Sequence, residues 1–144
     1  MTAPVLPHLA GAVRALLLAD ATFAALAPGG VAPAAPAEVT VPYAVMLCSV
    51  TPINAAAGAY RGTVALNGCA ARPVGSKQPL TAAWDIAARA AAVFACVRNT
   101  AYENVRYTAR VTDGPIELRP DTSRGEATPV YGAQIRVELT LHAH

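Results

Sequence analysis

The sequence has few charged residues, and this scarcity is its most unusual feature. Asp, Glu, Lys and Arg make up 14% of the 144 residues, whereas typical soluble domains contain about 25%. A free monomer with so little charge would present a neutral, apolar surface and would dissolve poorly. Two interpretations follow: neighbouring subunits cover much of the surface, or the surface consists of Ala, Gly, Thr and Pro.

A strong excess of either sign of charge is also lacking. The formal net charge is +2, from 11 basic and 9 acidic residues, and no run of like charge occurs. A surface dedicated to nucleic acid carries a clustered positive charge. The composition therefore excludes a protein whose main task is to hold nucleic acid.

Cysteine is sparse and widely spaced. Cys48, Cys69 and Cys96 form no CxxC pair and have no His at ligand spacing, so they indicate neither a zinc site nor a disulfide framework. We interpret them as single thiols that behave as small hydrophobic side chains. A bridge between Cys48 and Cys69 on neighbouring strands remains an alternative, and it would leave Cys96 free.

Residues that carry chemistry are missing from the usual patterns. The Ser residues lie in no GxSxG motif, and no glycine-rich loop is followed by Lys as in a phosphate-binding loop. The histidines lie near the ends of the chain, where preorganisation is poor: His8, His142 and His144. We therefore predict no catalytic residue and no cofactor.

Metal binding and acid–base chemistry are equally unsupported. His142 and His144 alternate and could face one metal ion, but no third ligand is evident, so an exposed polar tail is the simpler interpretation. Asp113, Glu117 and Asp121 cluster only in a turn sequence, which is typical of solvated loop charges. We predict no metal site.

The start of the chain resembles neither a signal peptide nor a membrane span. It has no basic n-region, and the apolar stretch from Leu9 to Leu26 is interrupted by Arg14 and Asp20. We expect a cytoplasmic product without a membrane partner.

Two main helices are predicted. Pro7 begins the first, in which one face carries apolar residues at helical spacing: Leu9, Val13, Leu16 and Leu17. Asp20 resembles the N-cap of a short turn, Ala21 to Leu26. Pro79 opens the second main helix, whose apolar stripe is expected to lie on a sheet and to include Trp84, Ile86, Ala90, Val93, Phe94 and Val97.

The remaining elements are predicted strands. Tyr43 to Val50 is nearly all apolar and is expected to be covered on both faces, whereas Thr63 to Ala70 alternates. These two form an antiparallel hairpin joined by a long loop, Thr51 to Ala59. Val105 to Thr112 and a short strand at Ile116 to Leu118 flank a tight turn at Asp113-Gly114. After a polar loop, the alternating stretch Val130 to Leu141 closes the chain.

The fold prediction follows from this order. We expect a single domain, residues 1–144, of the α+β class, in which two main helices pack on an antiparallel sheet in the order α-β-β-α-β-β-β.

Several short sequence segments resemble those of the tail terminator, or tail completion, proteins of long-tailed phages. They are the helix Ala15-Leu16-Leu17-Leu18-Ala19-Asp20-Ala21, the strand Val41-Pro42-Tyr43-Ala44-Val45 after a Pro-rich connector, the Ala-rich helix 82–95 and the closing strand 131–142. The resemblance covers about residues 9–141 and rests on short apolar motifs. The sequence departs from the family pattern at 71–79 and in the last hairpin loop.

The resemblance implies a structural virion protein and no enzyme. Such a protein forms a hexameric ring on the end of the tail tube, stops tube polymerisation and meets the head-completion, or stopper, protein. The genome passes through the lumen without specific binding. The expected location is the tail–neck junction of a virion made in the host bacterial cytoplasm. The alternative is a small homo-oligomeric α+β ligand-binding or enzymatic domain with its pocket between helix and sheet.

Two groups of residues are candidate assembly contacts. The uncharged stretch Thr51 to Ala59 is predicted to be a binding loop that becomes ordered against a neighbour, with contacts from Thr51, Pro52, Ile53 and Asn54. Charges are scarce, so those in loops are candidates for pairs between subunits or for lining the channel: Arg72, Lys77, Asp121, Arg124 and Glu126. The simpler interpretation of this second group is solvated surface charge.

Overall fold

The computed structural model describes residues 7–143. In chain order, the elements are α1 (Leu9–Ala19), α2 (Ala21–Leu26), β1 (Val31–Ala32), β2 (Tyr43–Asn54), a 3-10 turn η1 (Ala55–Ala57), β3 (Ala59–Ala70), α3 (Pro79–Ala95), β4 (Thr100–Tyr102), β5 (Val105–Glu117) and β6 (Tyr131–Ala143). Within this part of the chain, none of the helices is long and apolar enough to cross a lipid bilayer.

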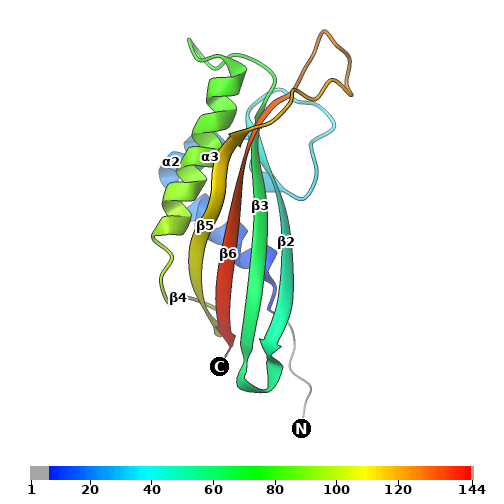
Figure 1. Cartoon of the computed structure of the whole chain (residues 1–144). Helices are drawn as coiled ribbons and strands as arrows, with labels where there is room; N and C mark the ends of the chain where they lie inside the picture. The colour runs from blue at the N-terminus through cyan, green and yellow to red at the C-terminus, as the bar shows by residue number, and fades with distance from the viewer. Residues whose placement is uncertain (1–6, 144) are drawn as a thin grey trace.

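The strands form one sheet in the order β1-β2-β3-β6-β5-β4 (Figure 1). β2, β3, β6 and β5 are long and pair antiparallel with their neighbours, as does β4 with β5. β1 pairs parallel with β2 at Ala44 and Val45. The α+β prediction is confirmed, but the sheet is mixed rather than antiparallel, and the predicted order omitted β1 and β4.

The helices lie on one face of the sheet, where the core forms (Figure 1). α3 packs on β3, β5 and β6 through Ile86, Ala90 and Phe94, all of which are fully buried. Val97 is buried just beyond the end of the helix, which confirms the predicted stripe. Trp84 does not belong to this face: it is 40% exposed, because a residue two positions before Ile86 points to the opposite side of a helix.

α1 and β6 follow their predicted patterns. Leu9, Val13 and Leu17 of α1 are buried, and the alternate residues of β6 that face the core are also buried: Ile135, Val137, Leu139 and Leu141. α1 begins at Leu9, after an N-cap at His8, so Pro7 precedes the helix rather than opening it. Burial of β6 on this face sets the register of the two strands that flank it.

Three strand predictions were wrong in extent. β2 continues to Asn54 and β3 begins at Ala59, so the hairpin arms extend into the predicted loop, with a register shift between Pro52 and Asn54. β5 runs through the predicted turn at Asp113-Gly114 and absorbs it in two register shifts. β2 is covered on both faces only near its start, because Leu47 is 63% exposed.

Candidate functional site

The face of the sheet opposite the helices is largely bare, and we call it the outer face. Strand alternation points one set of side chains to this side, and the register aligns them in rows across the strands. One row consists of Ser49, Thr63, Glu138 and Arg110. Another consists of Leu47, Ala65, Arg136 and Asp113. The outer face is therefore a continuous four-strand surface that the described residues leave open over most of its length.

Polar contacts between strands cross this face. The hydroxyl groups of Ser49 and Thr63 share a hydrogen bond, and the Gln134 amide donates to Asn67 Oδ1 over 2.8 Å. Arg61 Nε lies 3.8 Å from Glu138 Oε1, and both side chains are well exposed. An exposed pair of this kind contributes about 0–1 kcal/mol, so its value to the fold is small. A shallow groove of about 420 Å³ runs along the face beside Leu47 and Arg136.

The two lateral edges of the sheet differ. β1 covers β2 only at Ala44 and Val45, so residues 46–54 form a free edge in the part of the chain that the structure describes. On the other side, β4 covers β5 at Val105–Tyr107, and the Ala109 N–H donates to the Val97 carbonyl. Beyond that point β5 is interrupted by register shifts after Val111 and Asp113. Such bulges blunt an edge, whereas β2 pairs with β3 in unbroken register from Met46 to Pro52 and shifts register only between Pro52 and Asn54.

The end of the β2–β3 hairpin protrudes beyond the other strands (Figure 1). We call residues 51–59 the hairpin tip. Asn54 caps η1 by accepting a hydrogen bond from the Ala57 N–H at 3.2 Å, and Gly58 adopts a left-handed conformation with φ of +71°. Gly58 also accepts a hydrogen bond from the Ala143 N–H at 2.8 Å. The tip therefore has a defined conformation, with Ile53 56% exposed on it.

The charged candidates lie at the other end of the sheet. Arg124 donates to the carbonyl oxygens of Pro36 and Ala37, the latter over 2.5 Å, and so joins the last loop to the Pro-rich connector. Asp121 accepts a hydrogen bond from the Ser123 N–H at 2.9 Å, which lowers the pKa of its carboxyl group. Arg72 lines the same depression as Arg124.

Lys77 and Glu126 complete this group. Lys77 Nζ lies 2.7 Å from Asp85 Oδ2, in the second turn of α3, and Glu126 is exposed in the loop. The structure thus brings Arg72, Asp121 and Arg124 together but places Thr51, Pro52, Ile53 and Asn54 at the opposite end. The assembly role of both groups stays a prediction.

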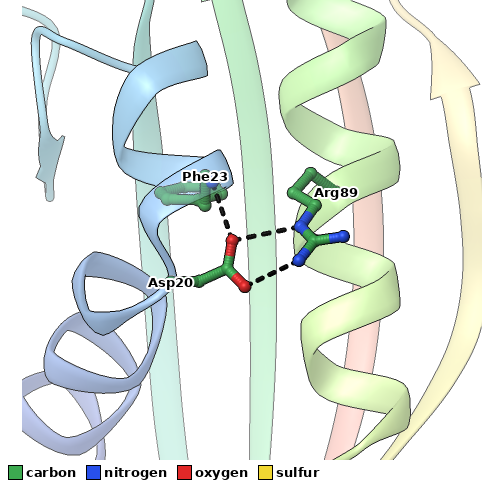
Figure 2. A network of polar contacts seen from close by, with 3 residues as sticks. All are labelled: Asp20, Phe23 and Arg89. Carbon is green, nitrogen blue, oxygen red and sulfur yellow. Dashed lines mark hydrogen bonds and ion pairs between the residues drawn. The ribbon is translucent and has the colours of Figure 1, made fainter.

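An ion pair that was not predicted joins the helices (Figure 2). Asp20 is the N-cap of α2, as expected, and accepts from the Phe23 N–H at 2.8 Å. Its carboxylate also receives two hydrogen bonds from the Arg89 guanidinium of α3, at 3.0 and 2.8 Å. The Arg89 hydrogen bond, aided by that from Phe23, lowers the pKa of Asp20 to about 2. This pair locks α2 to α3.

The cysteines are unbridged. Cys48 lies opposite Val64 and Cys69 lies opposite Tyr43 in the same hairpin, so they are five positions apart along β2 and the alternative bridge is wrong. Burial raises the pKa of both thiols to about 11, which makes them poor nucleophiles at neutral pH. Across residues 7–143, no three His, Cys, Asp or Glu side chains lie close enough to hold a metal ion. His144 lies outside the described residues.

One apolar pocket lies between α1 and β4. It has a volume of about 300 Å³, and its walls include Val13, Leu16, Val97, Tyr102, Tyr107 and Leu139. No charged residue lines it, and burial raises the pKa of Tyr107, which favours the neutral phenol. The pocket can hold apolar groups, and the polar side-chain groups among its lining residues are the hydroxyls of Thr100, Tyr102 and Tyr107.

Comparison with known proteins adds no family to these observations. No family model matches the chain, and no curated protein matches it.

Proposed function

We propose that this protein is a structural subunit that closes into a ring, and that the ring terminates a phage tail tube. The observation that carries the proposal is the form of the sheet, which has a bare outer face and a free edge on β2 that is regular from Met46 to Pro52. A free regular edge promotes pairing with another chain. A cyclic assembly satisfies this edge, because each subunit offers one side to the next and the rotation closes.

Strand direction is compatible with such closure. β2 is antiparallel to β3, β3 to β6 and β6 to β5, so the strands on the two sides run in opposite directions. In a ring with its axis along the strands, β2 of one subunit would meet β5 of the next in an antiparallel sense, outside the stretch Val105–Tyr107 that β4 covers. The sheets would then line the lumen with their outer faces, and the helices would lie outside.

The composition supports the same arrangement. With only 14% charged residues, the chain has little of the surface charge that keeps monomers apart. Neighbours on both sides would cover part of the neutral surface. The subunit number of six, the contact with tail-tube and head-completion proteins, the passage of genome DNA without specific binding and the location at the tail–neck junction all rest on the resemblance to tail terminators.

The proposal is tested by the state of assembly. Native mass spectrometry and light scattering should show a hexamer, either for the protein alone or only after addition of tail-tube protein. Negative-stain images should show rings with a central hole, alone or on tube ends. A protein that stays monomeric in both conditions and leaves tube ends free would overturn the proposal.

A second function is favoured by the apolar pocket between α1 and β4. Its volume of about 300 Å³ is at the lower limit for sites that hold small molecules, about 300–1,000 Å³. Under this alternative the protein is a small homo-oligomeric ligand-binding domain. A thermal-shift screen of small apolar compounds would distinguish the two functions, since a ligand-binding domain should gain stability from a specific compound and form no ring on tubes.

A further inference from the structure

We infer that the hairpin tip of one copy inserts Ile53 into the pocket between α1 and β4 of the next copy. This inference rests on the proposed self-assembly and names its contact. A protruding, preordered apolar group and an apolar hollow occur on the same chain, and each lacks an occupant or a cover among the described residues.

The tip is suited to insertion because its conformation is already set. The Asn54 cap, the left-handed Gly58 and the Ala143–Gly58 hydrogen bond hold it in place. Binding by a preordered element costs less conformational entropy than ordering a mobile loop. Residues 51–59 carry no charge, so no charged group would be buried with Ile53.

Ile53 is the exposed apolar residue best placed to insert into a pocket of another copy, and we call its side chain the knob. Leu47 and Ile116 lie on the broad face of the sheet, and Trp84 lies on the side of α3. Val41 and Val74 lie at the other end of the molecule. Among the exposed large apolar side chains of residues 7–143, Ile53 is the one that belongs to the hairpin tip, and the end of this hairpin protrudes beyond the other strands (Figure 1).

The knob and the pocket lie at the same level along the strands. Tyr60, beside the tip, pairs with Leu141, and Leu141 pairs with Tyr107 of the pocket wall. Tyr107 in turn pairs with Thr100 of β4, which also lines the pocket. A ring formed by rotation about an axis along the strands requires contacting groups to share this level.

Ile53 and the pocket also lie near opposite lateral edges of the sheet. The tip belongs to β2 at one side of the strand order, and the pocket lies under β4 at the other. A contact between different surfaces of identical chains is heterologous, and it propagates until the rotation closes. The pocket is small enough that one or two aliphatic side chains fill it, and Ile53 with a neighbouring alanine supplies them.

Disulfide trapping between copies tests the contact. Both variants carry Cys96→Ser, which removes the exposed native thiol. One variant adds Ile53→Cys and the other adds Ala101→Cys, at the pocket wall on β4. Mixed and oxidised, alone and with tail-tube protein, they should form a covalent heterodimer with a 53–101 linkage in its peptide map. Val74→Cys replaces Ile53→Cys in the matched control, because Val74 is an exposed apolar residue at the far end, and it should not link.

A second arm uses both cysteines in one chain. Ile53→Cys with Ala101→Cys should give a ladder of covalent oligomers that ends at the closed ring, whereas a two-fold contact would end at dimers. Ile53→Asp should weaken assembly about tenfold or more, as loss of a central apolar anchor does, and Val74→Asp should leave it unchanged.

The outcomes separate the contact from the function. Rings without a 53–101 linkage, or full assembly of Ile53→Asp, would overturn the inference and leave the proposed function standing. Specific occupation of the pocket by a small molecule in assembled rings would also overturn it. A chain that is monomeric alone and with tube protein would overturn both.

Discussion

Asp20 and Arg89 show how one residue can hold two elements. The carboxylate caps α2 and receives both hydrogen bonds from α3 (Figure 2). The cap was predictable, because Asp before a short apolar turn is a local signal. The partner was not, because Arg89 lies 69 residues away and only the packing of α2 on α3 brings it close. Trp84 was misplaced for a different, local reason: it lies two positions before Ile86 and therefore on the other side of the helix.

The pH dependence of stability should report this ion pair. The pKa of Asp20 falls from 3.8 to about 2 on folding, so its contribution is fully present above about pH 4. That contribution is lost as the pH falls from 4 towards 2, because the proton then binds the unfolded chain first. Asp20→Asn should lower the melting temperature at pH 7, and the difference from wild type should shrink near pH 2.

Thermal unfolding followed by circular dichroism at both pH values measures this effect. Glu126→Gln removes one carboxylate from an exposed loop and serves as the matched control. An Asp20→Asn difference that stays the same at both pH values would show that the carboxylate charge does not stabilise the fold.

At the scale of elements, the alternation of β6 and the stripe of α3 were predictable because each pattern fits one periodicity. The ends of β2, β3 and β5 were not. Pro52, Asn54 and Gly58 are typical of loops, but Pro is tolerated in an edge strand, and β2 is free on that side. Asp113-Gly114 is typical of a turn, but here it lies within the register shifts of β5. These Pro, Asn and Gly residues therefore indicated where the strand pairing is irregular, but they did not indicate whether the strand ends there or continues.

Packing of α3 on β3 depends on Gly68. A Cβ at this position would overlap the Ala83 carbonyl oxygen and lie 2.8 Å from Ile86 Cβ. The helix backbone must therefore move if Gly68 becomes Ala. Overpacking of this kind costs about 1–3 kcal/mol, so Gly68→Ala should lower the free energy of unfolding by that amount.

Urea denaturation measures this change. Ala65→Gly, on the outer face of the same strand, is the comparison for a change between the same two residue types, away from α3. Wild-type stability in Gly68→Ala would mean that α3 can shift without cost and that close approach does not limit the residue at 68.

For the whole molecule, the arrangement of layers follows from which faces are apolar. The helices cover the face of Val64, Leu66, Ile135 and Val137, and the polar alternates remain outside. The sequence could predict this layering, and it could identify the uncharged stretch at 51–59 as a candidate contact. It could not predict that this stretch is a preordered tip at the level of an apolar pocket, since that relation depends on the register of five strands.

The response of the assembly to salt should show which contacts hold it. Residues 46–59, which form the free edge and the tip, contain no charged residue, so a contact through them depends on apolar burial and backbone hydrogen bonds. Raising the salt concentration from 0.1 to 1 M shortens the screening length from about 10 to about 3 Å and weakens surface ion pairs. The hexamer should persist through this change when followed by light scattering.

Arg124→Glu provides the second arm of the salt experiment. Arg124 binds the carbonyl oxygens of Pro36 and Ala37 in its own chain, so the substitution should release the connector locally and leave assembly and its salt dependence unchanged. If Arg124 instead pairs with a neighbouring subunit, Arg124→Glu will weaken assembly at 0.1 M salt and the difference will narrow at 1 M. That result, together with a wild-type ring that dissociates at 1 M salt, would assign the contact to the charged loops rather than to the hairpin tip.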